Sequence, residues 1–197
     1  MLVNLIRKYL KLFFPSLRFI SFVKSNIFSN KNGKLRILIF HDIPPEDESV
    51  FSNLLIWLSK RWNFITPNEF EKIIKGESPN QGDNLLLTFD DGFRSSFTVA
   101  EKYLNPMNIK ALFFVVSDFI SINDPIKSKK FISDNIIPGM SPDLLPKHML
   151  NMSWNDLRSL INQGHFIGAH TKTHAKTSEI SNLKKLENEI IDSANYM

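Results

Sequence analysis

The chain has no cysteine among its 197 residues. This absence excludes disulfide bonds, thiolate metal sites and cysteine nucleophiles, although it does not identify a compartment. Long apolar runs are also lacking. In the middle of the apolar N-terminal segment the longest charge-free run is Leu12–Leu17, far short of the ~20 residues of a membrane-spanning helix. No secretory signal pattern is present either. We therefore expect a cytoplasmic or peripheral membrane location.

Carboxylates are absent from residues 1–41, which contain eight of the 24 lysine and arginine residues. The formal net charge of +4 is therefore unevenly distributed, because residues 42–197 hold 16 basic and all 20 acidic side chains. No arginine-rich helix or basic-aromatic patch occurs after this segment. The sequence thus gives no reason to expect a nucleic-acid partner.

The N-terminal segment, residues 1–34, is predicted to be a basic amphipathic unit separate from the remaining domain. Its apolar and basic side chains alternate with the period of a helix that ends at Pro15, as shown by Leu2, Ile6, Tyr9, Leu10 and Phe13 against Arg7, Lys8 and Lys11. Such a helix could lie on an anionic membrane surface through residues 1–24. Packing against the chain's own domain is the alternative.

Residues 35–197 are predicted to form one α/β domain, in which strands alternate with helices. The expected strands are Leu35–Phe40 (a buried strand), Asn63–Ile65, Asn84–Phe89, Lys110–Val116 and Phe166–Ala169. The expected helices are 50–60, 67–75 after a Thr66/Glu69 capping box, 96–104, 154–163 after Ser153 and Asp156, and 178–193. Residues 121–150 contain four prolines and no clear period, which indicates an irregular insertion or lid.

Chemistry-bearing residues follow three of these strands. His41-Asp42, Asp90-Asp91 and His170 each come directly after an apolar run. In parallel α/β sheets and barrels the active site gathers at the carboxyl ends of the strands. These residues are therefore expected to meet at one edge of the sheet.

Two short motifs supply the parts of a one-metal hydrolase: Thr88–Gly92, with two adjacent carboxylates, and His170–His174, with two histidines four residues apart. One aspartate and two imidazoles can hold a divalent ion, and the second carboxylate can act as a general base. Alone, each motif is weak evidence for a catalytic or metal-binding site. An Asp-Asp-Gly is usually a turn, and a pair of histidines at this spacing, which would share one face of a helical turn, is common on surfaces.

The two motifs together resemble those of the polysaccharide deacetylases, the NodB-homology domain of carbohydrate esterase family four. The resemblance extends over residues 35–190 and includes His41-Asp42-Ile43, Thr66-Pro67-x-x-Phe70, Phe113-Phe114-Val115, Met152-Ser153-Trp154 and Gly164-His165-x-Ile167-Gly168. It implies a distorted (β/α) barrel. It also implies removal of N-acetyl groups from a cell-surface polysaccharide, with release of acetate.

By this resemblance, Asp90 is the general base, and Asp91, His170 and His174 hold one divalent metal ion. Zinc is favoured, although cobalt, nickel and manganese also suit these ligands. Thr171 and Thr173 are expected to brace the loop by hydrogen bonds. An N-acetylated glycan is the expected substrate.

The chain departs from the family pattern after His174, where 23 residues remain and neither an Arg-x-Pro-aromatic nor a Leu-x-His motif occurs. We therefore expect a barrel that is incomplete because its C-terminal strands are absent, and that has no assigned general acid. His41 could take that role or be a packing residue. Asp42 could line the site or form a turn, whereas His148 and His165 are expected to be structural.

Two other functions remain open at this stage. One is a catalytically inactive, truncated deacetylase-like domain that binds a glycan or a protein partner at the membrane. The other is a related enzyme that hydrolyses a different amide, such as a cyclic ureide or imide.

Overall fold

A computed structural model describes residues 33–195 of the chain, of which Lys34 onward belongs to one compact unit. The predicted amphipathic helix in residues 1–24 lies outside the described residues. Within residues 33–195, no helix is both long and apolar enough to cross a lipid bilayer.

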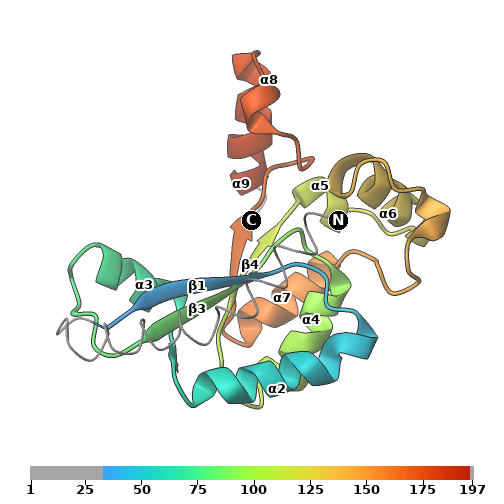
Figure 1. The fold of residues 1–197 in the computed structure, drawn as a ribbon. Coiled ribbons are helices and arrows are strands. Elements are labelled where there is room, and N and C mark those ends of the chain that lie inside the picture. The colour runs from blue at the N-terminus through green and yellow to red at the C-terminus, as the bar shows by residue number, and fades with distance from the viewer. Residues whose placement is uncertain (1–32, 196–197) are drawn as a thin grey trace, which may run out of the picture. The chain divides into compact units, whose positions relative to one another are not determined.

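A parallel sheet forms the centre of the unit (Figure 1). Its strands are β1 (Leu35–Phe40), β2 (Asn63–Phe64), β3 (Asn84–Phe89), β4 (Leu112–Val115) and β5 (Phe166–Ala169). The strand order is β1-β3-β4-β5, and β2 also pairs with the start of β3. Among the described residues the sheet is open, with β1 and β5 at its edges. The fold is thus the expected α/β type with an incomplete barrel.

Helical segments connect the strands. They are η1 (Pro45–Asp47), α2 (Glu48–Ser59), α3 (Pro67–Ile74), α4 (Arg94–Val99), η2 (Ala100–Leu104), α5 (Ser117–Ile120), α6 (Pro125–Phe131), η3 (Ile132–Ile136), η4 (Pro142–Leu144), α7 (Trp154–Asn162), η5 (Thr177–Glu179), α8 (Leu183–Glu187), η6 (Asn188–Asp192) and α9 (Ser193–Asn195). Figure 1 shows α2, α4 and α7 on one side of the sheet and α8 on the other.

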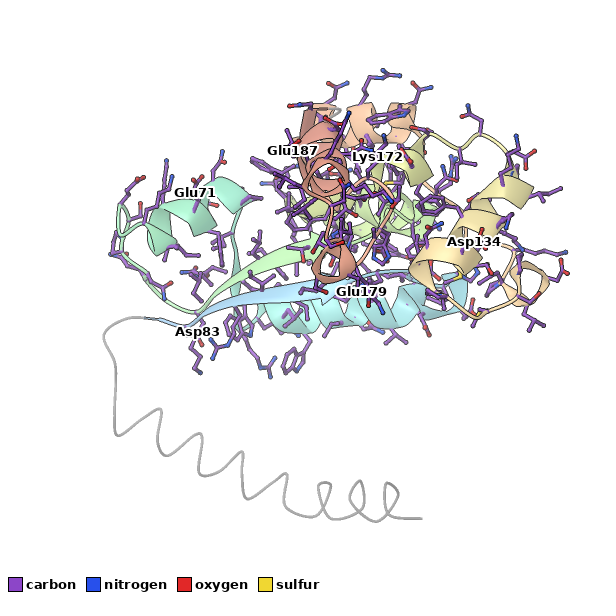
Figure 2. All side chains as sticks on the ribbon, turned by 90° about the horizontal axis from the view of Figure 1, so that it is seen from above. Glu71, Asp83, Asp134, Lys172, Glu179 and Glu187 are labelled. Carbon is purple, nitrogen blue, oxygen red and sulfur yellow. The ribbon has the colours of Figure 1, made fainter. Side chains whose placement is uncertain are left out.

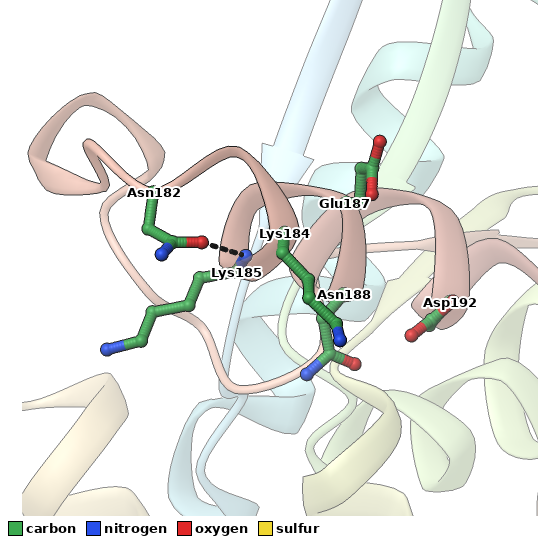
Figure 3. Close-up of a pocket in the computed structure, with 6 residues that line it drawn as sticks. All are labelled: Asn182, Lys184, Lys185, Glu187, Asn188 and Asp192. Atoms are coloured by element: carbon green, nitrogen blue, oxygen red, sulfur yellow. Dashed lines mark hydrogen bonds between the residues drawn. The ribbon is translucent and has the colours of Figure 1, made fainter.

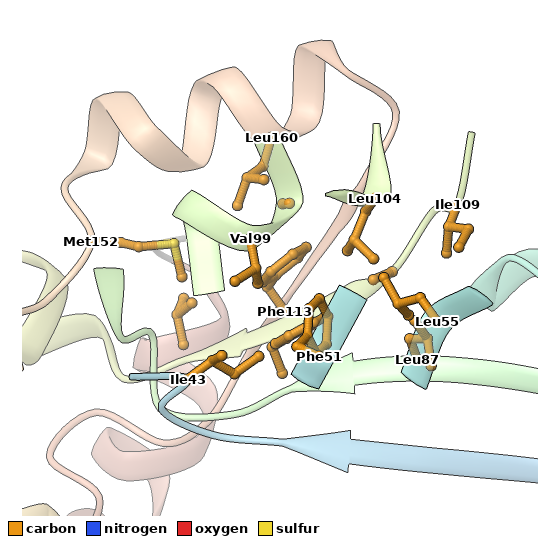
Figure 4. Packing of buried hydrophobic residues seen from close by; sticks show 14 of the residues in the cluster. Ile43, Phe51, Leu55, Leu87, Val99, Leu104, Ile109, Phe113, Met152 and Leu160 are labelled. Carbon is orange, nitrogen blue, oxygen red and sulfur yellow. The ribbon is translucent and has the colours of Figure 1, made fainter. Parts of the chain in front are cut away.

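The main core fills the space between the sheet and helices α2, α4 and α7 (Figure 4). The register of the strands pairs Phe40 with Phe89 and Phe89 with Phe113, so these three side chains lie on the same face of the sheet. Their ring centroids are 5.4 Å and 4.9 Å apart, respectively. Stacked aromatic pairs add to the energy of area burial, and this stack lies one residue before Asp90.

The two predicted capping boxes are confirmed. Thr66 accepts a hydrogen bond from the Glu69 amide at the start of α3, and Ser153 accepts one from the Asp156 amide at the start of α7. In each box the acidic side chain accepts a hydrogen bond from the backbone amide of the capping residue. The box therefore satisfies two backbone donors at the start of the helix.

Three expectations about local structure are wrong. β1 is not a buried strand, because it is an edge strand whose Ile37 and Ile39 are 47% and 54% exposed. Residues 121–150 are not wholly irregular: Asp124 caps α6, which continues as η3. The C-terminal helix begins at Leu183 rather than Ser178, because the side chain of Asn182 caps it.

Candidate active site

The Asp90-Asp91-Gly92 turn follows β3 at the carboxyl end of the sheet. Asp91 and Gly92 both have a positive φ, 72° and 93°, which L-residues other than Asn and Asp rarely adopt. A Cβ on Gly92 would lie 2.7 Å from Ile120 Cδ1 and 3.2 Å from Val115 Cγ1, and together with the positive φ these contacts favour glycine in this turn. The turn places the Asp91 side chain in the protein interior, where the residue is 2% exposed.

The histidine loop, residues 170–174, follows β5. The His170 amide donates to the Val115 carbonyl at 2.9 Å, which continues the β4–β5 pairing into the loop. Beyond it the backbone is not helical, so the expected helical turn is wrong. Thr171 and His174 each have a φ of 65°, and in this loop conformation both imidazoles lie beside the Asp91 carboxylate.

The Asp91 carboxylate and the two imidazoles form one group. Asp91 Oδ1 lies 3.5 Å from His170 Nε2 and 3.4 Å from His174 Nε2. All three candidate ligand atoms lie within 4.8 Å of one another. The structure thus brings together the three residues that the sequence analysis proposed as metal ligands.

The spacing of these atoms fits a shared divalent ion. Two ligand atoms bound at about 2.1 Å to one tetrahedral zinc ion are themselves about 3.4 Å apart. Asp91 Oδ1 is buried and has no hydrogen-bond partner within the described part of the chain, although buried carboxylate oxygens are normally satisfied. A cation would satisfy it.

A backbone carbonyl orients one of the imidazoles. His174 Nδ1 donates to the Asn135 carbonyl at 2.9 Å, which leaves the Nε2 lone pair facing Asp91. Asn135 belongs to η3, so residues 121–150 contribute directly to the site. Metal-binding histidines commonly carry such a contact on their second nitrogen. The nearby Asp91 carboxylate is the main cause of the raised pKa of His174, and the Asn135 carbonyl adds to it.

Asp90 is outside this ligand group but lies within its electrostatic field. Burial raises the pKa of the Asp90 carboxyl above its usual value, and the Asp91 charge acts in the same direction. The charges of His170, His41 and His174 lower the pKa. Its Oδ1 atom is buried without a hydrogen-bond partner in the described chain. A carboxylate in this environment is suited to accept a proton.

His41 and Asp42 follow β1 at the same edge of the sheet. His41 is exposed and close enough for its charge to act on Asp90. The two oxygens of Asp42 have protein partners: Ser95 Oγ donates to Oδ1 at 2.6 Å, and His148 Nε2 lies 2.9 Å from Oδ2. Asp42 therefore ties β1 to α4 and to the segment that carries His148.

The threonine side chains brace the histidine loop, as expected. Thr171 Oγ1 accepts from the His174 amide at 3.0 Å, and Thr173 Oγ1 donates to Glu189 at 2.8 Å. The sequence analysis missed Glu189 and Asn135. Glu189 carried no signal because it is one acidic residue in a polar helix, and Asn135 acts through its backbone.

A surface hollow along α8 and η6 contains none of these residues (Figure 3). It is lined by Asn182, Lys184, Lys185, Glu187, Asn188 and Asp192. Because all of these residues come from one helical segment, the hollow lies along the surface of that segment and does not form an enclosed site.

The fold and the site together define an α/β domain with a candidate metal-binding group at the carboxyl ends of its parallel strands. Residues 77–197 match the family model described as polysaccharide deacetylase. The chain therefore belongs to the polysaccharide deacetylase family. A comparison with curated proteins gives no significant match.

Solved structures with a similar fold include the following three proteins. The Streptococcus pyogenes deacetylase PplD, solved with acetate, is 17% identical with a TM-score of 0.63, over 84% of this chain and 68% of PplD. IcaB from Ammonifex degensii is 24% identical with a TM-score of 0.51, over 72% and 54%. The polysaccharide deacetylase BC0361 from Bacillus cereus is 17% identical with a TM-score of 0.55, over 82% and 46%. The chain thus spans about half to two thirds of their lengths.

Proposed function

We propose that the protein removes N-acetyl groups from a cell-surface polysaccharide in a reaction that depends on one divalent metal ion. The observation that carries this proposal is the group of Asp91, His170 and His174 within a polysaccharide deacetylase domain. Two imidazoles and one carboxylate form a mixed nitrogen–oxygen ligand set that suits zinc best, with cobalt, nickel and manganese as alternatives.

Asp91, His170 and His174 would hold the ion. An ion bound by three protein ligands would supply Lewis acidity, which lowers the pKa of water and polarises a carbonyl group. The three side chains leave one side of their group open, because His170 and His174 are partly exposed at 34% and 29% of their side-chain surface. Substrate and water would approach from that side.

Asp90 would act as the general base. Its carboxylate is not a member of the ligand group, and the raised pKa brings its proton affinity closer to the range needed for transfer near neutral pH. The carboxylate would accept the proton that water loses when its oxygen attacks the acetamide carbonyl. Hydrolysis then divides the amide into acetate and an amine.

His41 is our candidate for the group that protonates the departing amine. It lies at the same edge of the sheet as Asp90, and its charge acts on that carboxylate. An imidazole can donate a proton near neutral pH. H41Q, which keeps a polar side chain but cannot donate from an imidazolium, should lower kcat while the protein still binds metal.

The proposed function is tested by acetate release from N-acetylglucosamine pentamers and from purified peptidoglycan, with zinc- or cobalt-loaded protein. Wild type should release acetate, and D90N should lose that activity while keeping its metal. D143N, which neutralises an exposed carboxylate on η4, is the matched control and should remain active.

Other outcomes would point to the alternative functions. Glycan binding without acetate release, equal in wild type and D90N, would support an inactive binding module. Hydrolysis of cyclic ureides or imides in place of acetylated sugars would support a relative that acts on another amide.

A further inference from the structure

Glu189 is a buried carboxylate in η6, and it contacts the histidine loop through three hydrogen bonds. The residue is 8% exposed. Its Oε2 accepts from the amides of Lys172 and Thr173 at 3.1 Å and 2.9 Å, and its Oε1 accepts from Thr173 Oγ1 at 2.8 Å.

The two amides lie between the candidate ligands His170 and His174, in a loop with unfavourable backbone geometry. Thr171 and His174 have a positive φ, and for a β-branched residue such as threonine this conformation is an outlier. Such geometry persists only where surrounding contacts enforce it. Glu189 supplies those contacts on one side of the loop.

The loop also contacts α5 through a backbone hydrogen bond. The Asp118 amide donates to the Lys172 carbonyl at 3.0 Å, so both the amide and the carbonyl of Lys172 are engaged. The Lys172 side chain also reaches η6, where Nζ donates to Asn188 Oδ1 at 3.0 Å. Figure 2 shows Lys172 beside the helical segment that carries Glu187.

The Glu189 backbone makes a further hydrogen bond within its own helical segment. Its carbonyl accepts from Ser193 Oγ at 2.8 Å, and Ser193 is fully buried. Glu189 and Ser193 thus form the buried side of an otherwise largely exposed helical segment, and the carboxylate faces the loop from that side.

We propose that Glu189 is a positioning residue that holds the histidine loop in its metal-binding conformation before the ion arrives. This inference rests on the proposed function, because it takes His170 and His174 as ligands. Glu189 would touch neither metal nor substrate. It would raise metal affinity by keeping the two imidazoles in place.

A glutamine at this position should preserve most of the effect. Its side-chain oxygen can accept from both amides, and its NH₂ group can donate to Thr173 Oγ1, so the three contacts can persist without the charge. The charge of Glu189 acts against that of Asp118 nearby, so a neutral side chain would also remove a repulsion. The hydrogen bonds, and not the charge, should therefore decide the loop conformation.

The experiment compares E189L and E189Q with wild type and with E187L, which places the same apolar residue at an exposed position two residues earlier. Zinc affinity is measured by calorimetry with a competing chelator. E189L should bind zinc about 10- to 100-fold more weakly, the range typical of lost outer contacts to metal ligands. E189Q should stay within about threefold of wild type, and E187L should be unchanged.

A second readout does not need the metal. Amide hydrogen exchange in EDTA should be faster at Lys172 and Thr173 in E189L and close to wild type in E189Q. Circular dichroism checks that each variant is folded, and E189A replaces E189L if the larger apolar side chain prevents folding.

Each outcome separates this inference from the proposed function. Failure of wild type to bind zinc, cobalt, nickel or manganese would refute the metal-dependent function, although the exchange data would still test the loop contacts. Zinc binding by wild type that is unchanged in E189L would refute the role of Glu189 alone. Equal loss in E189Q and E189L would refute the hydrogen-bonding explanation.

Discussion

The stability of the domain should fall in mild acid because of His165. This residue is 4% exposed and lies edge-on to the Phe113 ring at 5.4 Å. Its Nδ1 accepts from the Ala111 amide at 3.1 Å. The proton of the neutral ring must therefore be on Nε2, which lies 3.0 Å from Asn105 Oδ1 and donates to it. Protonation of Nδ1 would break the bond with Ala111.

Burial, with a smaller contribution from the charge of Lys110, lowers the pKa of His165 from 6.5 to about 4. Between these values the unfolded chain binds a proton that the folded chain does not, so unfolding becomes more favourable as pH falls. The stabilisation is fully present above pH 6.5 and is lost as the pH drops toward 4. At ~1.36 kcal/mol per pKa unit, the loss is about 2–3 kcal/mol between pH 7.5 and pH 4.5.

Urea denaturation of metal-free protein at several pH values between 7.5 and 4.5 tests this value. H165Q has no titrating ring and should lower the free energy of unfolding at pH 7.5 by about 1–3 kcal/mol. Between pH 7.5 and pH 4.5, H165Q should lose about 2–3 kcal/mol less of its free energy of unfolding than wild type. The carboxylates are present in both proteins, so their contribution to the pH dependence cancels when the two profiles are subtracted. Parallel profiles for the two proteins would refute the reasoning.

Three further predictions concern the site, the core and the N-terminal segment. H174A should lose the near-equimolar zinc expected in wild type, as measured by elemental mass spectrometry, and equal metal content in both would contradict the ligand assignment. F89A should lower the free energy of unfolding by about 3–5 kcal/mol in urea denaturation, because Phe89 is 1% exposed and stacks on two other rings. Removal of residues 1–24 should abolish co-flotation with anionic lipid vesicles if this segment contacts membranes, and unchanged flotation would refute the membrane hypothesis.

Much of the fold could be predicted from local sequence signals. β3 and β5 have the predicted bounds because each is an apolar run that ends at polar residues. The capping boxes at Thr66 and Ser153 fixed two helix starts. The start of α6 carried a similar signal in Asp124-Pro125, but the prolines and mixed charge of the segment obscured it. The exposure of β1 could not be predicted, because burial of an edge strand depends on partners distant in sequence.

The candidate site was predictable in its residue types but not in its geometry. The spacing of His170 and His174 suggested a helical turn, whereas the loop uses left-handed backbone at Thr171 and His174. That conformation depends on tertiary contacts, above all those of Glu189 with the loop amides. A pattern of side chains contains no information on which backbone amides a distant carboxylate will bind.

The left-handed backbone of Asp91 also explains how two adjacent carboxylates can act on one site. In a continuing strand, neighbouring side chains point to opposite faces of the sheet, so Asp90 and Asp91 would be separated. The strand ends at Phe89, and the positive φ of Asp91 and Gly92 turns the chain. Asp91 then lies 3.4 Å and 3.5 Å from the two imidazoles, while the charges of the same imidazoles still act on Asp90. The Asp-Asp-Gly motif therefore forms a turn and also supplies a candidate ligand, because the turn brings the second carboxylate to the histidines.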